Sequence, residues 1–194
     1  MSFMLLGILN SQAAGGGGGG AAYELLESVT LSTDTATVSF TGLGSYSDYK
    51  HLQIRATTRA NTSGFAQQYM LFNGDTGSNY TTHRLFASSS SSTPGAGTYL
   101  NEGYIRFADN DRLTQSIADS FSPSVVDIYD FASTNKTTTV RVLEGRVGGE
   151  PGSSSNGVAI RSGLWNSTAA VTSIEFKTFA SYVAGTRFSL IGVK

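Results

Sequence analysis

Apolar and polar residues alternate in short runs along most of this chain. In the clearest run, residues 51–57 (HLQIRAT), Leu52 and Ile54 share one face and the polar residues between them share the other. A period of two is typical of a β-strand with one buried face. The runs that predict strands are 25–31, 36–40, 51–57, 68–72, 82–87, 99–108, 125–132, 137–147, 158–164, 171–178 and 187–193.

Turn-forming residues separate these runs. Asn73-Gly74 is a turn dipeptide, and segments rich in Ser, Gly and Pro at 88–95 and 148–157 indicate surface loops. Helix is scarce, because only 113–121 (LTQSIADSF) has a plausible helical turn. About ten or eleven short strands in one domain are typical of a sandwich or barrel. We therefore expect an all-β, jelly-roll-like β-sandwich over residues 23–194.

The first 22 residues differ from the rest. Residues 1–14 are apolar and then polar, and residues 15–22 form a tether that contains six consecutive glycines. The leader could pack on its own domain or dock on another protein, and we favour docking, because exposed apolar residues must be covered. The run is too short for a membrane span, and no Lys or Arg precedes it as in a secretory signal. The residues expected to anchor the chain are Phe3, Met4, Leu5, Leu6, Ile8 and Leu9.

The composition argues against nucleic-acid binding and excludes disulfides and thiolate metal sites. Only 14% of the residues are charged, the net charge is −1, and no basic block marks a nucleic-acid-binding surface. The chain has no cysteine, so disulfides and thiolate metal sites are excluded. Its arginines are scattered over many strands, and alternation assigns many of them to the outer face. Arginine is enriched at protein interfaces, which favours contacts in an assembly.

No motif for catalysis or metal binding stands out. His51 and His83 lie far apart in the chain, and neither is near a G-x-S-x-G elbow. Asp109 and Asp111 could serve a glycan hydrolase, but they also suit a polar turn. Residues 73–79 (NGDTGSN) depart from the EF-hand pattern, although another calcium site there stays open. We expect no enzyme activity, no cofactor and no metal.

Exposed aromatic residues could form a ligand site or an interface. Trp165 follows a predicted strand and stands beside a turn, so it could cap the core, join an interface or stack on a sugar. The residues considered for a ligand or interface role are Trp165, Tyr46, Tyr49 and Tyr80.

Several segments of the chain, in order, resemble a group of small β-rich virion proteins of tailed bacteriophages, often marine or cyanobacterial phages. The ending AGTRFSLIGV is similar to a close common in phage tail and fibre proteins, with Thr186 and Ile191 replacing Ser and Tyr. The other segments are 1–12 (MSFMLLGILNSQ), 26–30 (LESVT), 41–53 (TGLGSYSDYKHLQ), 72–80 (FNGDTGSNY) and 162–174 (SGLWNSTAAVTSI). They carry strand and turn signatures and supply no catalytic residue.

The resemblance implies a non-enzymatic structural protein of the virion, either a capsid decoration protein or a tail or fibre protein. We expect it to bind other virion proteins through its N-terminus and to form a homo-oligomer, namely a trimer. A receptor- or carbohydrate-binding module of a tail fibre, contacting a host-surface glycan, is the alternative, and a glycan hydrolase is a third interpretation. No nucleic-acid partner is expected.

Overall fold

The computed structural model describes residues 21–62, 66–88, 91–110, 120–146 and 156–194. These residues form twelve strands and one 3-10 turn, η1 (Leu43–Tyr46), and they contain no α-helix. No described helix has the length and apolar character needed to cross a membrane. The strands are β1 (Tyr23–Thr30), β2 (Thr35–Thr41), β3 (His51–Thr58), β4 (Ala66–Phe72), β5 (Tyr80–Ser88), β6 (Ser91–Glu102), β7 (Ile105–Asn110), β8 (Ser122–Tyr129), β9 (Thr138–Arg146), β10 (Gly157–Trp165), β11 (Ser173–Tyr182) and β12 (Arg187–Val193).

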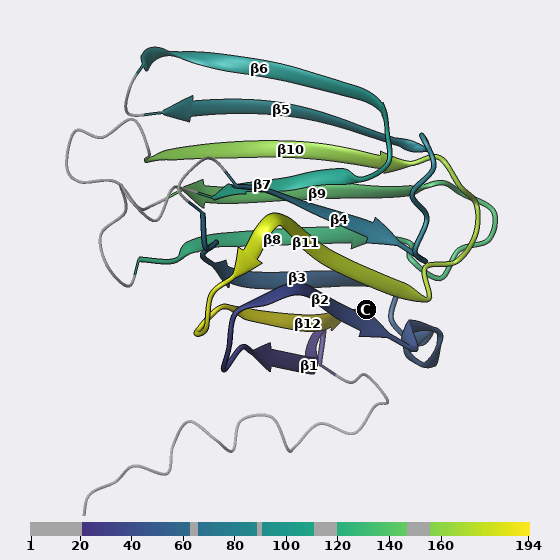
Figure 1. The fold of residues 1–194 in the computed structure, drawn as a ribbon. Coiled ribbons are helices and arrows are strands. Elements are labelled where there is room, and N and C mark those ends of the chain that lie inside the picture. Colours follow the sequence, from purple (N-terminus) through teal and green to yellow (C-terminus); the bar gives the residue numbers. More distant parts are fainter. Residues whose placement is uncertain (1–20, 63–65, 89–90, 111–119, 147–155) are drawn as a thin grey trace, which may run out of the picture.

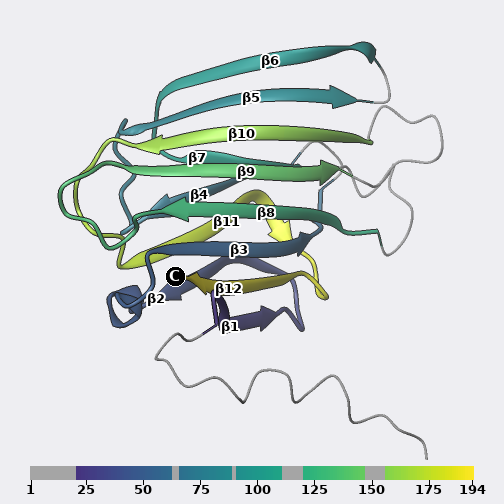
Figure 2. The same ribbon diagram turned by 180° about the vertical axis from the view of Figure 1, so that it is seen from behind.

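Two antiparallel sheets pack face to face, so the predicted all-β sandwich is confirmed. The larger sheet has eight strands in the order β1-β12-β3-β8-β9-β10-β5-β6, and the smaller has four in the order β2-β11-β4-β7. Figures 1 and 2 show the two layers from opposite sides, with β1 and β6 at the two edges of the larger sheet. β7 packs across β5, β9 and β10.

The core between the sheets consists of the inward residues of each strand. β8 shows the alternation clearly, since Val126 and Ile128 are fully buried while Val125, Asp127 and Tyr129 are half-buried. The Phe176 ring lies near the centre of this core, and its centroid is 4.9 Å from that of Phe188 and 5.2 Å from that of Phe107. Burial of such apolar surface is the main driving force for folding.

One predicted strand is in fact two. The run 99–108 breaks near Gly103, and β6 and β7 belong to different sheets. Asn101 has a positive φ of 56°, and a Cβ on Gly103 would lie 2.8 Å from the carbonyl oxygen of Thr76. The backbone therefore makes a tightly packed turn at residues 101–103, where the chain passes from one sheet to the other. Alternation of apolar and polar residues does not reveal such a change of sheet.

The predicted loop at 88–95 is also partly wrong. β6 begins at Ser91 and includes Pro94. Among the described strands, β6 lies at the edge of its sheet and pairs only with β5, so a residue without an N–H is tolerated there. The predicted leader, most of the tether, most of the predicted helical turn and most of the loop 148–157 lie outside the described residues.

Candidate functional site

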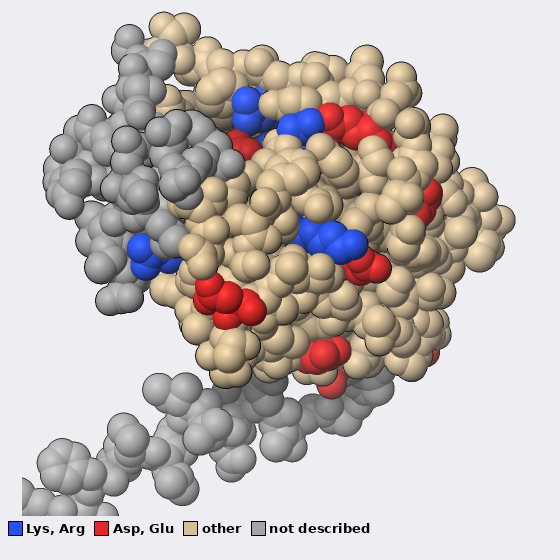
Figure 3. Space-filling model, viewed as in Figure 1, with Lys and Arg blue, Asp and Glu red and all other residues tan. Residues whose placement is uncertain are grey.

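A pocket of about 660 Å³ opens between the end of the larger sheet and β7. Its described lining comes mainly from β5, β9 and β10, with single residues from β4, β6, β7 and β11. Figure 3 shows acidic and basic side chains side by side in the upper part of the face presented by the smaller sheet. Residues of both sheets therefore line the pocket, which lies beside the apolar core where charged residues follow the apolar ones.

A fully buried arginine lies beneath the floor of the pocket. Arg161 of β10 donates from Nε to Glu144 Oε2 at 2.8 Å and from Nη2 to Glu144 Oε1 at 3.0 Å. Its Nη2 also donates to Asp109 Oδ2 at 2.8 Å. The three side chains come from β10, β9 and β7, so this ion-pair cluster links the two sheets.

The burial of this cluster affects how its members ionise. Burial raises the pKa of the Glu144 carboxyl, and the neighbouring Arg161 opposes that shift. For Arg161, burial disfavours the charge, but Glu144 and Asp109 outweigh it and hold the pKa of the guanidinium above its ordinary value. Buried ion pairs of this kind contribute little net stability, and perturbed groups gather at functional sites.

Arg84 of β5 forms a wall of the pocket. Its Nη1 donates to Asp109 Oδ2 at 2.8 Å, and its guanidinium lies 4.5 Å from the ring centroid of Phe86. Facing residues on β6 are Gly97 and Gly95, where a Cβ would lie 3.1 Å from Arg84 Nε and 2.4 Å from Phe86 Cζ. These glycines therefore leave the space that the two β5 side chains occupy.

Arginine and aromatic side chains continue from Arg84 as an alternating series. The Arg84 guanidinium lies 5.5 Å from the Tyr99 ring centroid, and Arg106 lies 4.1 Å from Tyr99 and 5.4 Å from Tyr104. Arg106 also forms an ion pair with Glu102. We call this series, which comprises Phe86, Arg84, Tyr99, Arg106 and Tyr104, the cation–π ladder.

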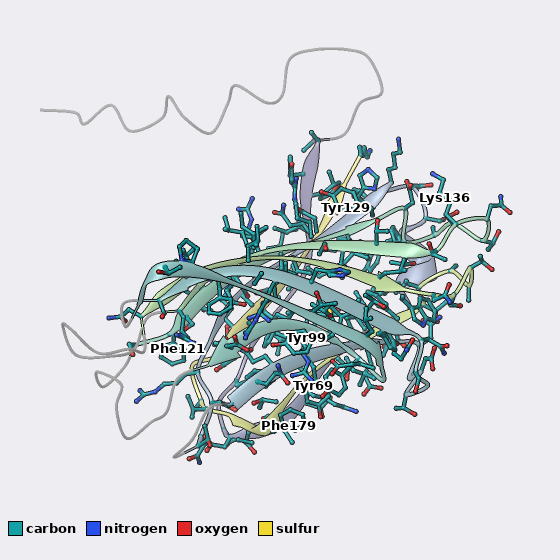
Figure 4. All side chains as sticks on the ribbon, turned by 90° about the horizontal axis from the view of Figure 1, so that it is seen from above. Tyr69, Tyr99, Phe121, Tyr129, Lys136 and Phe179 are labelled. Carbon is teal, nitrogen blue, oxygen red and sulfur yellow. The ribbon has the colours of Figure 1, made fainter. Side chains whose placement is uncertain are left out.

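Two more rings extend the ladder toward the rim of the pocket. Tyr69 lies 4.6 Å from Tyr104 and 5.0 Å from Phe179, measured between ring centroids. Phe179 lines the pocket and is 63% exposed. In Figure 4, Tyr69, Tyr99 and Phe179 lie on the same side of the molecule, away from Tyr129 and Lys136.

No protein-family model, no curated protein and no solved structure matches this chain.

A second unusual surface lies on the outer face of the larger sheet. Ile160 pairs with Leu85 on one side and with Leu143 on the other, and Leu143 pairs with Val125. Leu85, Ile160 and Leu143 are 65%, 56% and 54% exposed. We call these four residues, which cross β5, β10, β9 and β8, the apolar row. A contiguous exposed apolar surface is typical of a contact with a partner.

Arg161 is an exception to the expectation that many of the arginines face outward. Arg161 shares its phase on β10 with Ala159 and Gly163, which are buried, whereas Val158 and Ile160 are exposed. Arg84 also lines the inner pocket. The alternation along β10 does not reveal this site, because apolar residues occupy the outer face of the strand. The small inward residues on either side of Arg161, Ala159 and Gly163, are the signal in the sequence that Arg161 faces inward.

The aromatic residues considered for a ligand or interface role lie in two regions. Trp165 and Tyr80 are buried in the core with nearly parallel rings, and neither has an exposed ring face. Burial raises the pKa of the Tyr80 hydroxyl to about 12. Tyr46 and Tyr49 are half-buried, and Tyr49 packs over Gly192 of β12. The anchor residues Phe3 to Leu9 lie outside the described residues.

Two of the candidate chemical residues, Asp109 and His51, are engaged in structural contacts. Asp109 binds Arg84 and Arg161, while Asp111 lies outside the described residues. His51 Nδ1 accepts a hydrogen bond from the Asp130 backbone N–H. Within the described ranges, no group of three or more His, Cys, Asp or Glu side chains could hold a metal ion.

Proposed function

We propose that the sandwich is a jelly roll that carries two inserted hairpins. Strands β1-β12-β3-β8 of the larger sheet and β2-β11-β4-β7 of the smaller sheet have the strand order of two interlocked Greek keys. The hairpins β5–β6 and β9–β10 add four strands to one edge of the first set. Jelly rolls recur in viral coat proteins and lectins, so this topology suits a particle component.

The proposed function is that of a non-enzymatic structural component of a tailed-phage virion, as a capsid decoration or tail or fibre protein. The chain would be attached to other virion proteins through Phe3, Met4, Leu5, Leu6, Ile8 and Leu9. The observation that carries this proposal is the completeness of the core. The described residues bury a continuous apolar cluster from both sheets, so the fold does not need the leader to fill it.

The arrangement of the edges supports two separate contacts. β1 follows the glycine tether and forms one edge of the larger sheet, whereas β5 and β6 lie at the other edge. The apolar row spans β5 to β8, away from the point where the tether joins the domain. The leader could therefore hold the particle while the apolar row contacts a second copy of the chain, as in the proposed homotrimer.

The anchoring proposal is tested by removing residues 2–14 and retaining the tether. Phage particles assembled with the full chain or with the truncated chain are purified and analysed by quantitative mass spectrometry. We expect the truncated chain to be lost from particles while its melting temperature in solution stays the same. Incorporation of the truncated chain at the level of the full chain would refute the anchor.

A matched pair of variants separates apolar docking from a general effect of the leader. Replacing Leu5, Leu6 and Ile8 with Ser removes apolar surface from the anchor, and we expect it to abolish incorporation. Replacing Asn10, Ser11 and Gln12 with Ala changes the polar end of the same leader and is expected to leave incorporation intact.

A further inference from the structure

We infer that a groove on the outer face of the larger sheet binds a phosphate monoester, that is, a small phosphorylated compound. The groove has a volume of about 410 Å³, which is within the range of small-molecule sites, and it lies over β1, β12 and β3. This inference goes beyond the proposed structural role, because attachment to a particle requires no such site. The lining that carries the inference consists of Arg55, Thr57, Arg187 and Ser189 on the polar side and Leu25 and Ile191 on the apolar side.

Two arginines lie next to each other in this groove. Arg55 of β3 is opposite Ser189 of β12, and Arg187 is opposite Thr57 in the same pair of strands. The two arginines are therefore diagonal neighbours on one face of the sheet, where long side chains reach each other. Both are exposed, whereas Ala56, which alternates with them on β3, is buried in the core. Both guanidinium groups thus lie on the side of the sheet that faces away from the core.

The positive charges of these two arginines are not compensated by carboxylates. Four other arginines form ion pairs with an Asp or Glu, namely Arg84, Arg106, Arg141 and Arg161. Within the described ranges, no carboxylate forms an ion pair with Arg55 or Arg187. Two neighbouring like charges repel each other, and an anion bound between them removes that repulsion. The pair therefore favours a ligand that carries two negative charges.

Acidic residues on the neighbouring strands are engaged elsewhere. Asp127 of β8 is in an ion pair with a different arginine, and Glu24 of β1 accepts a hydrogen bond from the Tyr49 hydroxyl. Glu27 of β1 is opposite Leu190, which is buried in the core. Because opposite residues in a ladder share a face, Glu27 lies on the other side of the sheet from the groove. None of these three carboxylates therefore neutralises the arginine pair.

Each guanidinium is held at its Nε, which leaves its terminal amino groups available. Arg55 Nε donates to Gln53 Oε1 at 2.9 Å, and Arg187 Nε donates to Ser28 Oγ at 3.3 Å. Gln53 is itself held, because its Nε2 donates to Asp127 Oδ1 at 2.8 Å. No described residue accepts a hydrogen bond from Nη1 or Nη2 of either arginine. The two forks are thus fixed on one side and open to an acceptor on the other.

The number of charges and oxygens favours a phosphate monoester over other anions. A guanidinium presents a planar fork that binds two oxygens of an anion. A phosphate monoester has three acceptor oxygens and a charge of about −1.5 to −2 at pH 7, so it can accept from both forks and balance both charges. A carboxylate has one charge and would leave the second arginine unpaired. The phosphodiester of a nucleic-acid strand also has only one charge per phosphate.

Apolar residues beside the arginines indicate an organic group on the phosphate. Leu25 of β1 is opposite Ile191 of β12, and both line the groove. Leu25 is 59% exposed, so a ligand that covers it removes apolar surface from water, which favours binding. Inorganic phosphate would satisfy the arginines alone, whereas an ester also uses this apolar side of the groove.

Isothermal titration calorimetry of the purified full chain tests the inference without any particle. The titrations are done at about pH 8, well above the second pKa of about 6 of a phosphate ester. The probes are phenyl phosphate, phenyl sulfate, which has a similar shape but one charge, inorganic phosphate, and a single-stranded DNA oligonucleotide without a terminal phosphate. We expect phenyl phosphate to bind at least about tenfold more tightly than phenyl sulfate and inorganic phosphate.

Three results of these titrations would overturn the inference. Phenyl phosphate that does not bind at millimolar concentration would show that the groove is not a site for phosphate monoesters. Equal affinity for phenyl phosphate and phenyl sulfate would refute the preference for a doubly charged ligand. Tighter binding of the DNA than of phenyl phosphate would assign the groove to nucleic acid instead. Equal affinity for inorganic phosphate would refute the contact between the organic group and Leu25.

Variants of the two arginines then place the ligand in this groove. Arg55→Gln and Arg187→Gln are each expected to weaken binding of phenyl phosphate at least about tenfold, and because both side chains are exposed, both variants keep the fold. Lys136→Gln is the matched control, because it removes one charge from a side chain that is 65% exposed and does not line the groove. Unchanged affinity in either arginine variant would contradict the assigned site.

A charge-preserving variant separates recognition by the two forks from general attraction between charges. Arg55→Lys/Arg187→Lys keeps both positive charges but removes the planar forks, and we expect it to weaken binding of phenyl phosphate about tenfold. Full affinity in this double variant would show that only net charge attracts the ligand, and it would refute a site built from two oriented guanidinium groups.

Discussion

The indole Nε1 of Trp165 donates a hydrogen bond of 2.8 Å to a carboxylate oxygen of Asp75. The same carboxylate accepts hydrogen bonds from the Gly77 backbone N–H at 2.8 Å and from Asn79 Nδ2 at 3.0 Å. These bonds, that of Trp165 first, hold the pKa of Asp75 below its ordinary value. The turn after β4, which the sequence also allowed as a calcium site, therefore uses its acidic residue to tie the loop to the core.

Asp75→Asn is expected to destabilise the domain by about 1–3 kcal/mol at pH 7, because the charge-assisted hydrogen bonds are lost. Asp75 has a lowered pKa in the folded state, so its contribution is complete above the unfolded pKa of about 3.9 and disappears as the pH falls through the folded value. The gap between wild type and variant should therefore close under acid. Urea unfolding at pH 7, 5 and 3 measures this gap, with the exposed Asp48→Asn as control. A gap that does not shrink between pH 5 and pH 3 would contradict this role of Asp75.

The buried Arg161–Glu144 pair predicts strong coupling between the two positions. Glu144→Leu leaves the buried guanidinium with Asp109 as its remaining carboxylate partner, and we expect a loss of about 3–5 kcal/mol. The double variant Arg161→Met/Glu144→Leu should lose much less than the sum of the two single variants. A double-mutant cycle from denaturant unfolding gives the coupling energy.

The exposed pair Arg141–Asp127 supplies the control for that cycle. Arg141 Nη2 lies 2.7 Å from Asp127 Oδ2, but the arginine side chain is mostly exposed to solvent. Arg141→Gln should therefore cost less than about 1 kcal/mol. If the losses in free energy of unfolding at Arg161 and Glu144 add up in the double variant, to within the effect measured for Arg141→Gln, the buried pair is not coupled.

The strands could be predicted from the sequence wherever apolar residues occupy the inner phase. β3 and β8 are of this kind, and their alternation gives both the element and its buried face. β10 reverses the rule, because Val158 and Ile160 are exposed and Arg161 is buried. Periodicity reports a strand but not which face is covered, so the candidate site on the inner face of β10 could not be predicted.

The assignment of each strand to one of the two sheets could not be predicted from the sequence either. β6 and β7 follow each other closely, and only Gly103 and the positive φ of Asn101 mark the crossing between layers. The ion-pair cluster joins Asp109, Glu144 and Arg161, which are far apart in the chain. Such a cluster depends on the strand order, which local alternation does not encode.

Gly163→Ala is expected to overpack the space between the sheets. Gly163 faces inward on β10, and a Cβ there would lie 2.8 Å from Cγ2 of Ile105 on β7. We expect a loss of about 1–3 kcal/mol, because close-packed interiors tolerate added methyl groups poorly. The double variant Gly163→Ala/Ile105→Val removes Cδ1 of Ile105, which would lie 3.1 Å from the new Cβ, and should recover part of that loss. Thermal unfolding measures both, and an unchanged melting temperature in Gly163→Ala would show that the sheets can separate at no cost.

The apolar row predicts self-association of the chain. Leu143→Ser/Ile160→Ser removes two of its most exposed side chains, and we expect association between copies to weaken at least about tenfold. The free energy of unfolding of the monomer should change by less than about 1 kcal/mol, because neither side chain lies in the core. Sedimentation equilibrium of the full chain over a range of concentrations gives the oligomeric mass, and the proposed trimer should dissociate in the variant.

A control on another exposed leucine separates this surface from general hydrophobicity. Leu100→Ser changes a residue of similar exposure on β6 that lies outside the apolar row, so the mass of the oligomer should stay that of wild type. If the wild-type chain stays monomeric at high concentration, the apolar row does not bind a second copy of the chain. If the Leu143→Ser/Ile160→Ser variant still forms the oligomer, self-association uses a different surface. Replacing a leucine and an isoleucine at the centre of a contact with serine would remove a large buried apolar area, so a contact through the apolar row could not persist.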